Sequence, residues 1–345
     1  MNPPAVIPPA AVPGRSDPEA LLAGASEGDR VALARLLSLV ERGGEPMRAV
    51  ARIAYRAPIP YTVGLTGAPG AGKSTLTDHL ITAARGGWPP PGDDGGPRTP
   101  IDQVAVLAVD PSSPFTGGAI LGDRIRMQDH ATDRSVYIRS MATRGHLGGL
   151  ALAVPDAVRV LGAAGMPVVL VETVGVGQME VEVASAADTT VVVVNPGWGD
   201  SMQTSKAGLL EVADLFVINK ADRPGVPEAR RDLQQMLDLS GHVDWRPPVV
   251  ETVAATGEGV ERLWEEIAGH RRYLVDKGLL EQRRSARLEQ GLRRILAARL
   301  AVRVESTAAG DAFAGVVESV VQGRIDPYRA ADQLLGPELP NPGAA

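Results

Sequence analysis

Residues 64–75 read GLTGAPGAGKST, and this stretch decides the fold class of the chain. The part from Gly67 to Ser74 matches G-x-x-x-x-G-K-[ST], between an apolar strand pattern and a helical one, as this motif requires. Its glycines let backbone N–H groups turn towards phosphate oxygens, and the following helix adds its positive end. The stretch predicts a P-loop in which Lys73 reaches the β- and γ-phosphates and Ser74 ligates Mg²⁺. The competing interpretation is a glycine-rich turn without a ligand. The predicted phosphate-binding residues are Gly67, Ala68, Pro69, Gly70, Ala71, Gly72, Lys73, Ser74 and Thr75.

Short apolar runs alternate with helical segments after this point. They are YTVGL (61–65), VAVLAV (104–109), VVLV (168–171), TTVVVVN (189–195), LFVIN (215–219) and PVVET (248–252). Strands that alternate with helices predict an α/β fold of the P-loop NTPase type, with a mainly parallel sheet flanked by helices. Ligands of such sheets bind at the carboxyl ends of the strands.

The chain divides by composition into five predicted parts. They are a disordered Pro/Ala-rich tail (1–16), an N-terminal helical extension (17–58), the P-loop domain (59–258), a C-terminal helical region (259–336) and a short tail (337–345). Residues 86–100 are a Gly/Pro-rich insertion that predicts a flexible surface loop.

Helical signals mark both extensions. Asp17-Pro18 predicts an N-cap and first turn, and the helix that follows shows i, i+3, i+4, i+7 apolar spacing. The C-terminal region carries a second apolar stripe, which either packs against the core or forms a dimer interface. The apolar positions are Leu33, Leu36, Leu37 and Val40, then Val260, Leu263, Trp264 and Ile267, and finally Leu288, Leu292, Ile295 and Leu296.

Composition excludes several classes of protein. The chain has no cysteine, which rules out disulfides and thiolate metal sites and favours a reducing, cytoplasmic location. We expect no signal peptide and no membrane span, since no apolar stretch is long enough. A net charge of −6 disfavours nucleic acid as a partner. The arginine pairs at 230–231, 271–272, 283–284 and 293–294 are expected on solvated helix faces.

The sequence NKAD, residues 219–222, predicts recognition of guanine. An aspartate there accepts hydrogen bonds from guanine N1 and N2, and adenine offers no such pair of donors, so Asn219, Lys220 and Asp222 favour GTP over ATP. The later ETVAATGEGV (251–260) falls where a further base-binding loop is expected, with the Ala254 N–H available to guanine O6. The base-binding residues of this loop are Val253, Ala254 and Ala255, although Val253 stands where serine is common.

Two carboxylates at strand ends are candidate magnesium ligands. Glu172 ends the apolar run 168–171, and a charge there needs a cation because burial of a lone charge is costly. Asp110 ends another run, and its alternative role is an Asx-type turn with the two serines that follow Pro111. Gly175, shortly after Glu172, offers a backbone N–H to the γ-phosphate.

Taken together, these residues resemble one family, the methylmalonyl-CoA mutase-associated GTPases, called MeaB and in older usage ArgK or LAO/AO transport ATPase. The similarity extends over roughly residues 18–336. The motifs that carry it are GAPGAGKSTL (67–76), VDPSSPFTGGAILGDRIRM (109–127), RSMATRGHLGGLA (139–151), ETVGVGQMEVEVA (172–184), PGWGDSMQTSKAGLLEVADLFVINKAD (196–222) and IDPYRAADQLL (325–335).

The resemblance implies a homodimeric GTPase, dimerised through its C-terminal helices, that binds GTP, GDP and Mg²⁺. It also implies a partner, an adenosylcobalamin-dependent acyl-CoA mutase, whose cofactor loading the GTPase gates and which it protects or reactivates. The residues that match the family's magnesium and catalytic region are Ser74, Asp110, Asp123 and Glu172, and the catalytic candidates are Lys73, Asp123 and Glu172.

Residues 197–206 match a third switch loop of the family, but with departures. The family's GAGDELQ is GWGDSMQ here, which introduces Trp198, Ser201 and Met202. Lys206 is either part of this switch or a solvated helix lysine. Together with the long insertion, the departures leave open which acyl-CoA mutase is the partner.

The hydrolytic residue is not evident. Where many signalling GTPases carry a water-orienting glutamine the chain has Val176, and Gln178 comes two residues later. We therefore expect slow intrinsic hydrolysis that a partner accelerates. Arg124 or Arg126 either supplies positive charge in the transition state or is a surface arginine.

Three other classes of P-loop protein compete with this interpretation. A nickel metallochaperone GTPase needs a His or Cys cluster, and a targeting GTPase of the signal-recognition type needs a Met-rich domain. Neither feature is present, because the five histidines and eight methionines are scattered. An ATP-dependent kinase linked to amino-acid transport stays open, since it predicts phosphoryl transfer to protein rather than to water.

Overall fold

The computed structural model describes residues 17–87, 100–110, 130, 133–142, 149–173, 186–197, 212–239, 244–308 and 310–335. The predicted tails, most of the 86–100 insertion and Asp123 lie outside these residues. The strands are β1 (Tyr61–Gly67), β2 (Val104–Asp110), β3 (Val136–Ala142), β4 (Val168–Thr173), β5 (Thr189–Val194), β6 (Leu215–Asn219) and β7 (Val249–Thr252). The helices are α1 (Pro18–Ser26), α2 (Arg30–Arg42), α3 (Gly44–Ala54), α4 (Lys73–Arg85), α5 (Gly149–Ala163), α8 (Val226–Leu239), α9 (Val260–Asp276), α10 (Leu279–Ala308), α11 (Asp311–Val321) and α12 (Pro327–Leu335).

The seven strands form one parallel sheet in the order β3-β2-β4-β1-β5-β6-β7. All six predicted strands are present, so the α/β fold with a parallel sheet is confirmed. The register places Leu65 of β1 beside Glu172 of β4, and Gly67 beside Val193 of β5. The P-loop therefore leaves the centre of the sheet, next to the end of β4.

The sequence analysis did not predict β3. Its residues include Arg139 and Ser140, which interrupt the apolar pattern of VYIRSMA. Because β3 is an edge strand, it tolerates these polar residues. The Arg139 guanidinium pairs with Glu41 of α2, at 2.9 Å from Nη2 to Oε2. An edge strand held by an ion pair lacks the apolar signature of a central strand.

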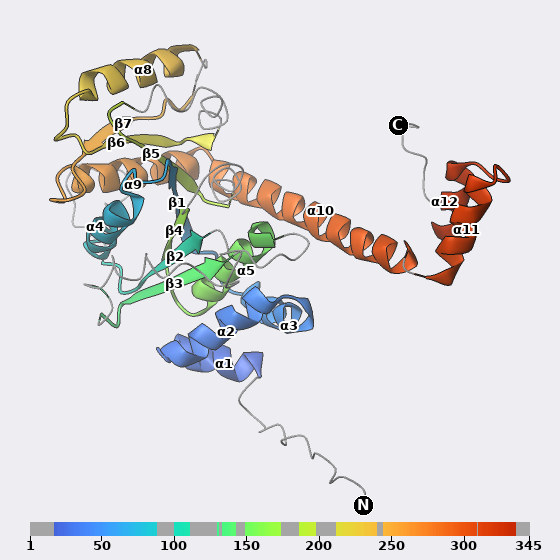
Figure 1. Ribbon diagram of the computed structural model, residues 1–345. Helices are drawn as coiled ribbons and strands as arrows, with labels where there is room; N and C mark the ends of the chain where they lie inside the picture. The colour runs from blue at the N-terminus through green and yellow to red at the C-terminus, as the bar shows by residue number, and fades with distance from the viewer. Residues whose placement is uncertain are drawn as a thin grey trace, which may run out of the picture. The chain divides into compact units, whose positions relative to one another are not determined.

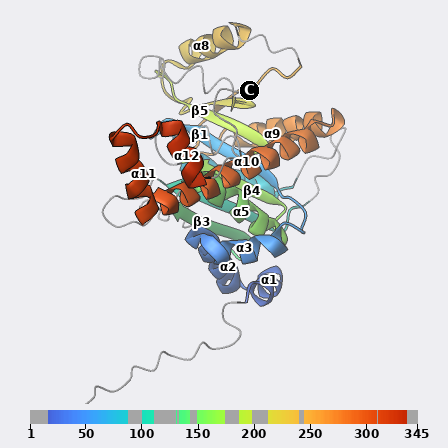
Figure 2. The same cartoon turned by 90° about the vertical axis from the view of Figure 1, so that its right-hand side faces the viewer.

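Helices cover both faces of the sheet (Figure 1). On one face, α4 and α9 pack against alternate residues of the central strands. On the other face, α5 covers β2–β4 and α8 covers β5 and β6. Both Figure 1 and Figure 2 show α2 and α3 beside α5, where their apolar residues join the same core.

The N-terminal extension forms the helices that the sequence predicts. Asp17 caps α1, accepting a hydrogen bond from the Glu19 N–H, and Pro18 occupies the first turn. In α2, the predicted apolar face is buried, and its residues are Leu33, Leu36, Leu37 and Val40. The extension is thus part of the main core.

The chain divides into two compact units between Arg287 and Leu288. The sequence-based boundary at 258/259 marks the end of the strand signals, but the apolar side of α9 belongs to the core of the sheet. The second unit contains the rest of α10, with α11 and α12 packed together, and Ala330 is its one buried residue among those described. None of the described helices combines the length and apolarity that a bilayer span needs.

The expectation that all arginine pairs lie on solvated faces is wrong for Arg284. Its side chain is only 12% exposed and forms an ion pair with Asp188, whereas Arg283, which pairs with Asp214, is 41% exposed. The sequence pattern of a helix does not reveal whether its polar face contacts buried carboxylates or solvent. By contrast, Arg293 is exposed and pairs within its own helix, as expected.

Candidate active site

The P-loop forms a tight backbone turn between β1 and α4. Gly67 has φ +131°, and a Cβ there would lie 2.1 Å from the Val193 carbonyl oxygen. Gly72 has φ +92°, and its Cβ would lie 2.3 Å from Nδ2 of Asn219. Both positions require glycine, for conformation and for space.

The amino end of α4 is not capped by a side chain. Its N-cap is Gly72, and no side-chain hydrogen bond satisfies the first N–H groups of the helix. Uncapped N–H groups and the helix dipole together attract an anion. This is the arrangement that the sequence predicted for a phosphate site.

Lys73 lies on the inside of the loop. Its ammonium group donates to the carbonyl oxygens of Gly67 and of Ala68, the latter at 3.1 Å, and the residue is 6% exposed. The positive charge is therefore held within the turn that would surround a phosphate.

The Ser74 hydroxyl donates to Oε1 of Glu172 at 2.5 Å. Ser74 is 6% exposed and Glu172 is 1% exposed, so this contact joins α4 to the end of β4 inside the protein. Two of the predicted magnesium ligands, 98 residues apart in the chain, meet here. Both offer oxygen, the atom that Mg²⁺ prefers.

Asn219 joins the P-loop to the base-binding segments. Its amide nitrogen donates to the Ala71 carbonyl oxygen at 2.7 Å. Its Oδ1 accepts from the Thr252 hydroxyl at 3.1 Å and from the Ala254 N–H at 3.0 Å. Since the side chain is buried, this one residue fixes three loops at the carboxyl edge of the sheet.

Lys220 and Asp222 complete the NKAD segment. Lys220 donates to the Gly70 carbonyl oxygen at 2.6 Å, with φ +60°, and no other non-glycine residue in the described ranges has a positive φ. Asp222 is exposed in the turn after β6. Its carboxylate is thus open to a base that binds above the P-loop.

The last base-binding loop follows β7. Val253, Ala254 and Ala255 lie there, and the Ala254 N–H donates to Oδ1 of Asn219 at 3.0 Å. The contact of this N–H with guanine O6 stays a prediction. Sequence reasoning did not identify Thr252, although its place at the end of the strand PVVET is a usable signal.

Other predicted residues are not placed. The backbone of Asp110 ends β2, as predicted, but its side chain is not described. Asp123, Arg124, Arg126, Gly175, Val176, Gln178 and residues 198–206 lie outside the described ranges.

The parallel sheet, the uncapped P-loop and the Asn219 junction define a P-loop nucleotide hydrolase that binds guanine nucleotides. The family model described as "Methylmalonyl Co-A mutase-associated GTPase MeaB" matches residues 33–309. The chain belongs to this family, and it is a GTPase.

Relatives from distant organisms agree with this assignment. A candidate GTPase from Pyrococcus abyssi is 49% identical over 90% of this chain and 93% of its own length. GTPase ArgK from Escherichia coli is 37% identical over 78% of this chain and 80% of its own. The Methylmalonic aciduria type A homolog, mitochondrial, from Mus musculus is 31% identical over 91% of this chain and 78% of its own length.

A solved structure also matches. It is the crystal structure of an LAO/AO transport system kinase, with a TM-score of 0.66 and 26% identity over 94% of this chain and 98% of that one. The similarity therefore includes the helical extensions as well as the nucleotide-binding sheet.

Proposed function

We propose that this GTPase holds Mg²⁺ through Ser74 and Glu172, and that its GTP cycle controls an adenosylcobalamin-dependent acyl-CoA mutase. Control means gating the loading of the cofactor and protecting or reactivating the mutase. The GTPase would act in the cytoplasm, because a chain without cysteine needs no disulfide and is suited to a reducing compartment.

The contact between Ser74 and Glu172 carries the magnesium part of the proposal. The hydroxyl and the carboxylate are both buried and lie 2.5 Å apart beside the P-loop, so their oxygens suit a hard cation. Bound Mg²⁺ would neutralise charge that develops on the β- and γ-phosphates. Asp110 and Asp123 remain proposed ligands.

The chain's own groups orient the nucleotide. The N–H groups at the start of α4 and the Lys73 ammonium would hold the phosphates. The Asp222 carboxylate would accept hydrogen bonds from guanine N1 and N2. Hydrolysis would be slow without a partner, because Val176 stands in the place of a water-orienting glutamine. A partner that completes the site would then set the rate.

The mutase part of the proposal is supported by names of similar proteins. The family description says "Methylmalonyl Co-A mutase-associated", and the mouse relative is named for methylmalonic aciduria. The test is co-purification of the chain with candidate adenosylcobalamin mutases, followed by GTP turnover with and without them. We expect association and faster phosphate release with one mutase. Neither effect with any of them would refute the chaperone role and leave the GTPase intact.

A transport-linked kinase is the second candidate, favoured by the similarity to the solved LAO/AO transport system kinase. It predicts transfer of the terminal phosphate from ATP to protein. Labelled GTP and ATP separate the two functions, since phosphate release from GTP supports the GTPase and labelled protein from ATP supports the kinase.

We also propose a homodimer formed through the C-terminal helices. No residue of α10, all of which is described, is buried. From Leu288 to Leu300 its exposed large apolar side chains recur at i, i+4, i+7, i+8 and i+12, and Val302 and Val304 are exposed further along the helix. The five that form the stripe are Leu288, Leu292, Ile295, Leu296 and Leu300, each 40–57% exposed. A second copy of the same face would cover this stripe.

A further inference from the structure

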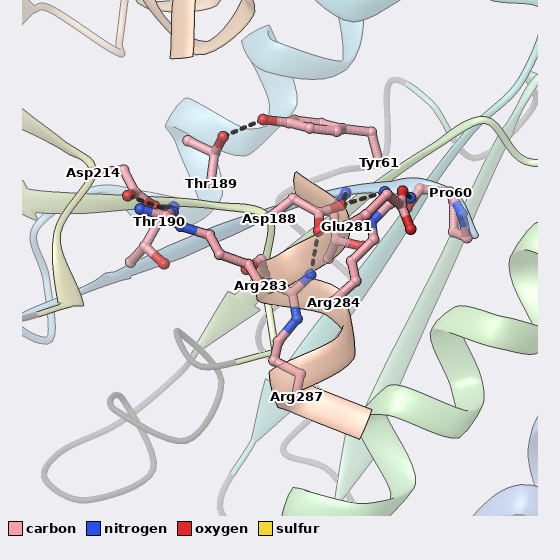
Figure 3. A network of polar contacts seen from close by, with 12 residues as sticks. Pro60, Tyr61, Asp188, Thr189, Thr190, Asp214, Glu281, Arg283, Arg284 and Arg287 are labelled. Carbon is pink, nitrogen blue, oxygen red and sulfur yellow. Dashed lines mark hydrogen bonds and ion pairs between the residues drawn. The ribbon is translucent and has the colours of Figure 1, made fainter. Parts of the chain in front are cut away.

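Figure 3 shows two aspartates, Asp188 and Asp214, in a network of polar contacts. They occupy equivalent places at the amino edge of the sheet, whereas the P-loop leaves β1 at the carboxyl edge. Asp188 immediately precedes β5, and Asp214 immediately precedes β6. The Asp188 N–H donates to the Thr62 carbonyl oxygen at 2.8 Å, and its Oδ2 accepts from the Thr62 N–H at 3.1 Å. Asp214 repeats this pair of contacts with Thr190, at 3.0 and 2.9 Å. Each carboxylate is therefore fixed by the neighbouring strand.

Each fixed carboxylate binds arginines from the start of α10. Arg284 contacts Asp188 with two nitrogens, at 3.1 Å from Nε to Oδ1 and 2.7 Å from Nη2 to Oδ2. Arg287 also binds Asp188. Arg283 binds Asp214 at 3.0 Å from Nη1 to Oδ1. The first turns of α10 are thus attached to two strands by ion pairs of defined geometry.

The ion pair of Asp188 is more deeply buried than that of Asp214. Its side chain is 1% exposed, and that of Arg284 is 12% exposed. Burial alone would lower the pKa of Arg284, but the hydrogen bonds and charge of Asp188 raise it above its ordinary value. Only the carboxylate of this pair is fully buried, and a pair with such defined geometry fixes orientation more than it adds stability.

Asp188 lies between the nucleotide site and α10 in the fold. It lies 16 residues after Glu172 in the sequence, at the end of the segment that follows the proposed magnesium ligand. Arg287 also donates to the backbone carbonyl oxygen of Ala187, so α10 contacts the main chain two residues before β5 begins. The next residue, Leu288, begins the second unit and the apolar stripe.

We propose that Asp188 couples the nucleotide site to α10. The occupancy of the nucleotide site sets how firmly Asp188 and the Ala187 carbonyl hold Arg284 and Arg287, through β5, whose Val193 lies beside Gly67 of the P-loop. The inference rests on the proposed GTP cycle with Mg²⁺, but not on the identity of the partner.

Amide hydrogen exchange of residues 279–300 tests the coupling. The intact chain is measured with GDP and with a non-hydrolysable GTP analogue and Mg²⁺. We expect the exchange of α10 in the wild type to differ between the two nucleotides. In Asp188→Asn the difference should be lost, while the affinity for both nucleotides, measured on the same samples, is retained.

Glu41→Gln provides a matched control. It disrupts the Arg139–Glu41 pair, which also has two hydrogen bonds and low exposure, but joins α2 to β3 instead of α10. It should keep the wild-type difference. If Asp188→Asn does not fold, Arg287→Gln decides, because its side chain is more exposed, at 23%.

Three outcomes would overturn the coupling. They are a wild type without a nucleotide-dependent difference, an Asp188→Asn variant that keeps it, or a Glu41→Gln variant that loses it equally. Failure to bind GTP at all would instead refute the proposed function, and the affinity measurement identifies that case.

Discussion

Single residues at the active site have two roles at once. The glycines of the P-loop were predicted because phosphate must approach the backbone. The structure adds that Gly67 and Gly72 leave no room for a Cβ against Val193 and Asn219. The same glycines that open the loop to a ligand also let it pack against the strands.

Gly72→Ala should therefore lower both stability and nucleotide affinity. The added methyl group would meet the Asn219 amide at a backbone position with φ +92°, which disfavours any Cβ. We expect a loss of about 2 kcal/mol in the free energy of unfolding, and weaker GTP binding by calorimetry. Gly165→Ala is the control, because Gly165 has φ +91° but nothing within 4 Å of its Cβ. Equal nucleotide affinity in the two variants would contradict the role of the Asn219 contact.

Ser74→Ala tests the proposed metal site. Removing the hydroxyl should weaken GTP binding by roughly tenfold or more in the presence of Mg²⁺, the scale commonly seen when a group that supports a metal is lost. In excess chelator, the affinities of variant and wild type should coincide. An equal loss with and without Mg²⁺ would show that Ser74 acts only on the fold of the loop.

At the scale of elements, the apolar strands could be predicted from the sequence. The contacts of the polar residues at the strand ends were harder to predict. Six strands follow from apolar runs, whereas β3 was missed because this edge strand carries the polar residues Arg139 and Ser140. Glu172 and Asn219 were found because they end apolar runs at the functional edge. Asp188 and Asp214 precede their strands, where sequence gives no sign that an arginine from a helix about 70 to 100 residues later will bind them.

Asp214 gives the attachment of α10 a dependence on pH. Burial alone would raise the pKa of Asp214, but hydrogen bonding and charge from His270, with Arg283 and the Thr190 N–H, lower it below its ordinary value of 3.8. A lowered pKa in the folded state means that the stabilisation is present above the unfolded pKa and is lost as pH falls through the folded one.

Asp214→Asn should consequently cost about 2 kcal/mol near neutral pH, as loss of hydrogen bonds to a charged group does. Urea unfolding from pH 7 to pH 3 should show the difference between variant and wild type shrinking below pH 3.8. A difference that stays constant over this range would mean that the carboxylate charge does not contribute.

At the scale of the whole molecule, the two compact units have unequal cores. The first buries three apolar clusters around the sheet, while the second has a single buried residue among those described. A unit with so little buried area needs a partner surface to be stable. The predicted dimer would supply it.

Introducing charge into the stripe tests this dimer. Leu292→Glu combined with Leu296→Glu should convert a dimer to a monomer in light scattering, because charge cannot be buried between two apolar faces without a partner. Gln290→Glu adds charge on another face of the same helix and should leave the dimer intact. A wild type that is monomeric at all concentrations would contradict the dimer.

The central claim is that the carboxyl edge of the sheet binds and hydrolyses a guanine nucleotide. It is tested most directly by changing both the base of the nucleotide and Asp222, the residue proposed to recognise it. Xanthine carries a carbonyl oxygen where guanine carries an amino group, so the side-chain amide in Asp222→Asn can donate a hydrogen bond to this oxygen, which a carboxylate cannot do. We measure phosphate release from GTP, ATP and XTP by the wild type and by Asp222→Asn. The account predicts GTP turnover by the wild type, little with ATP, and a change of preference to XTP in the variant. Unchanged GTP turnover in Asp222→Asn, or ATP turnover equal to that with GTP in the wild type, would contradict it.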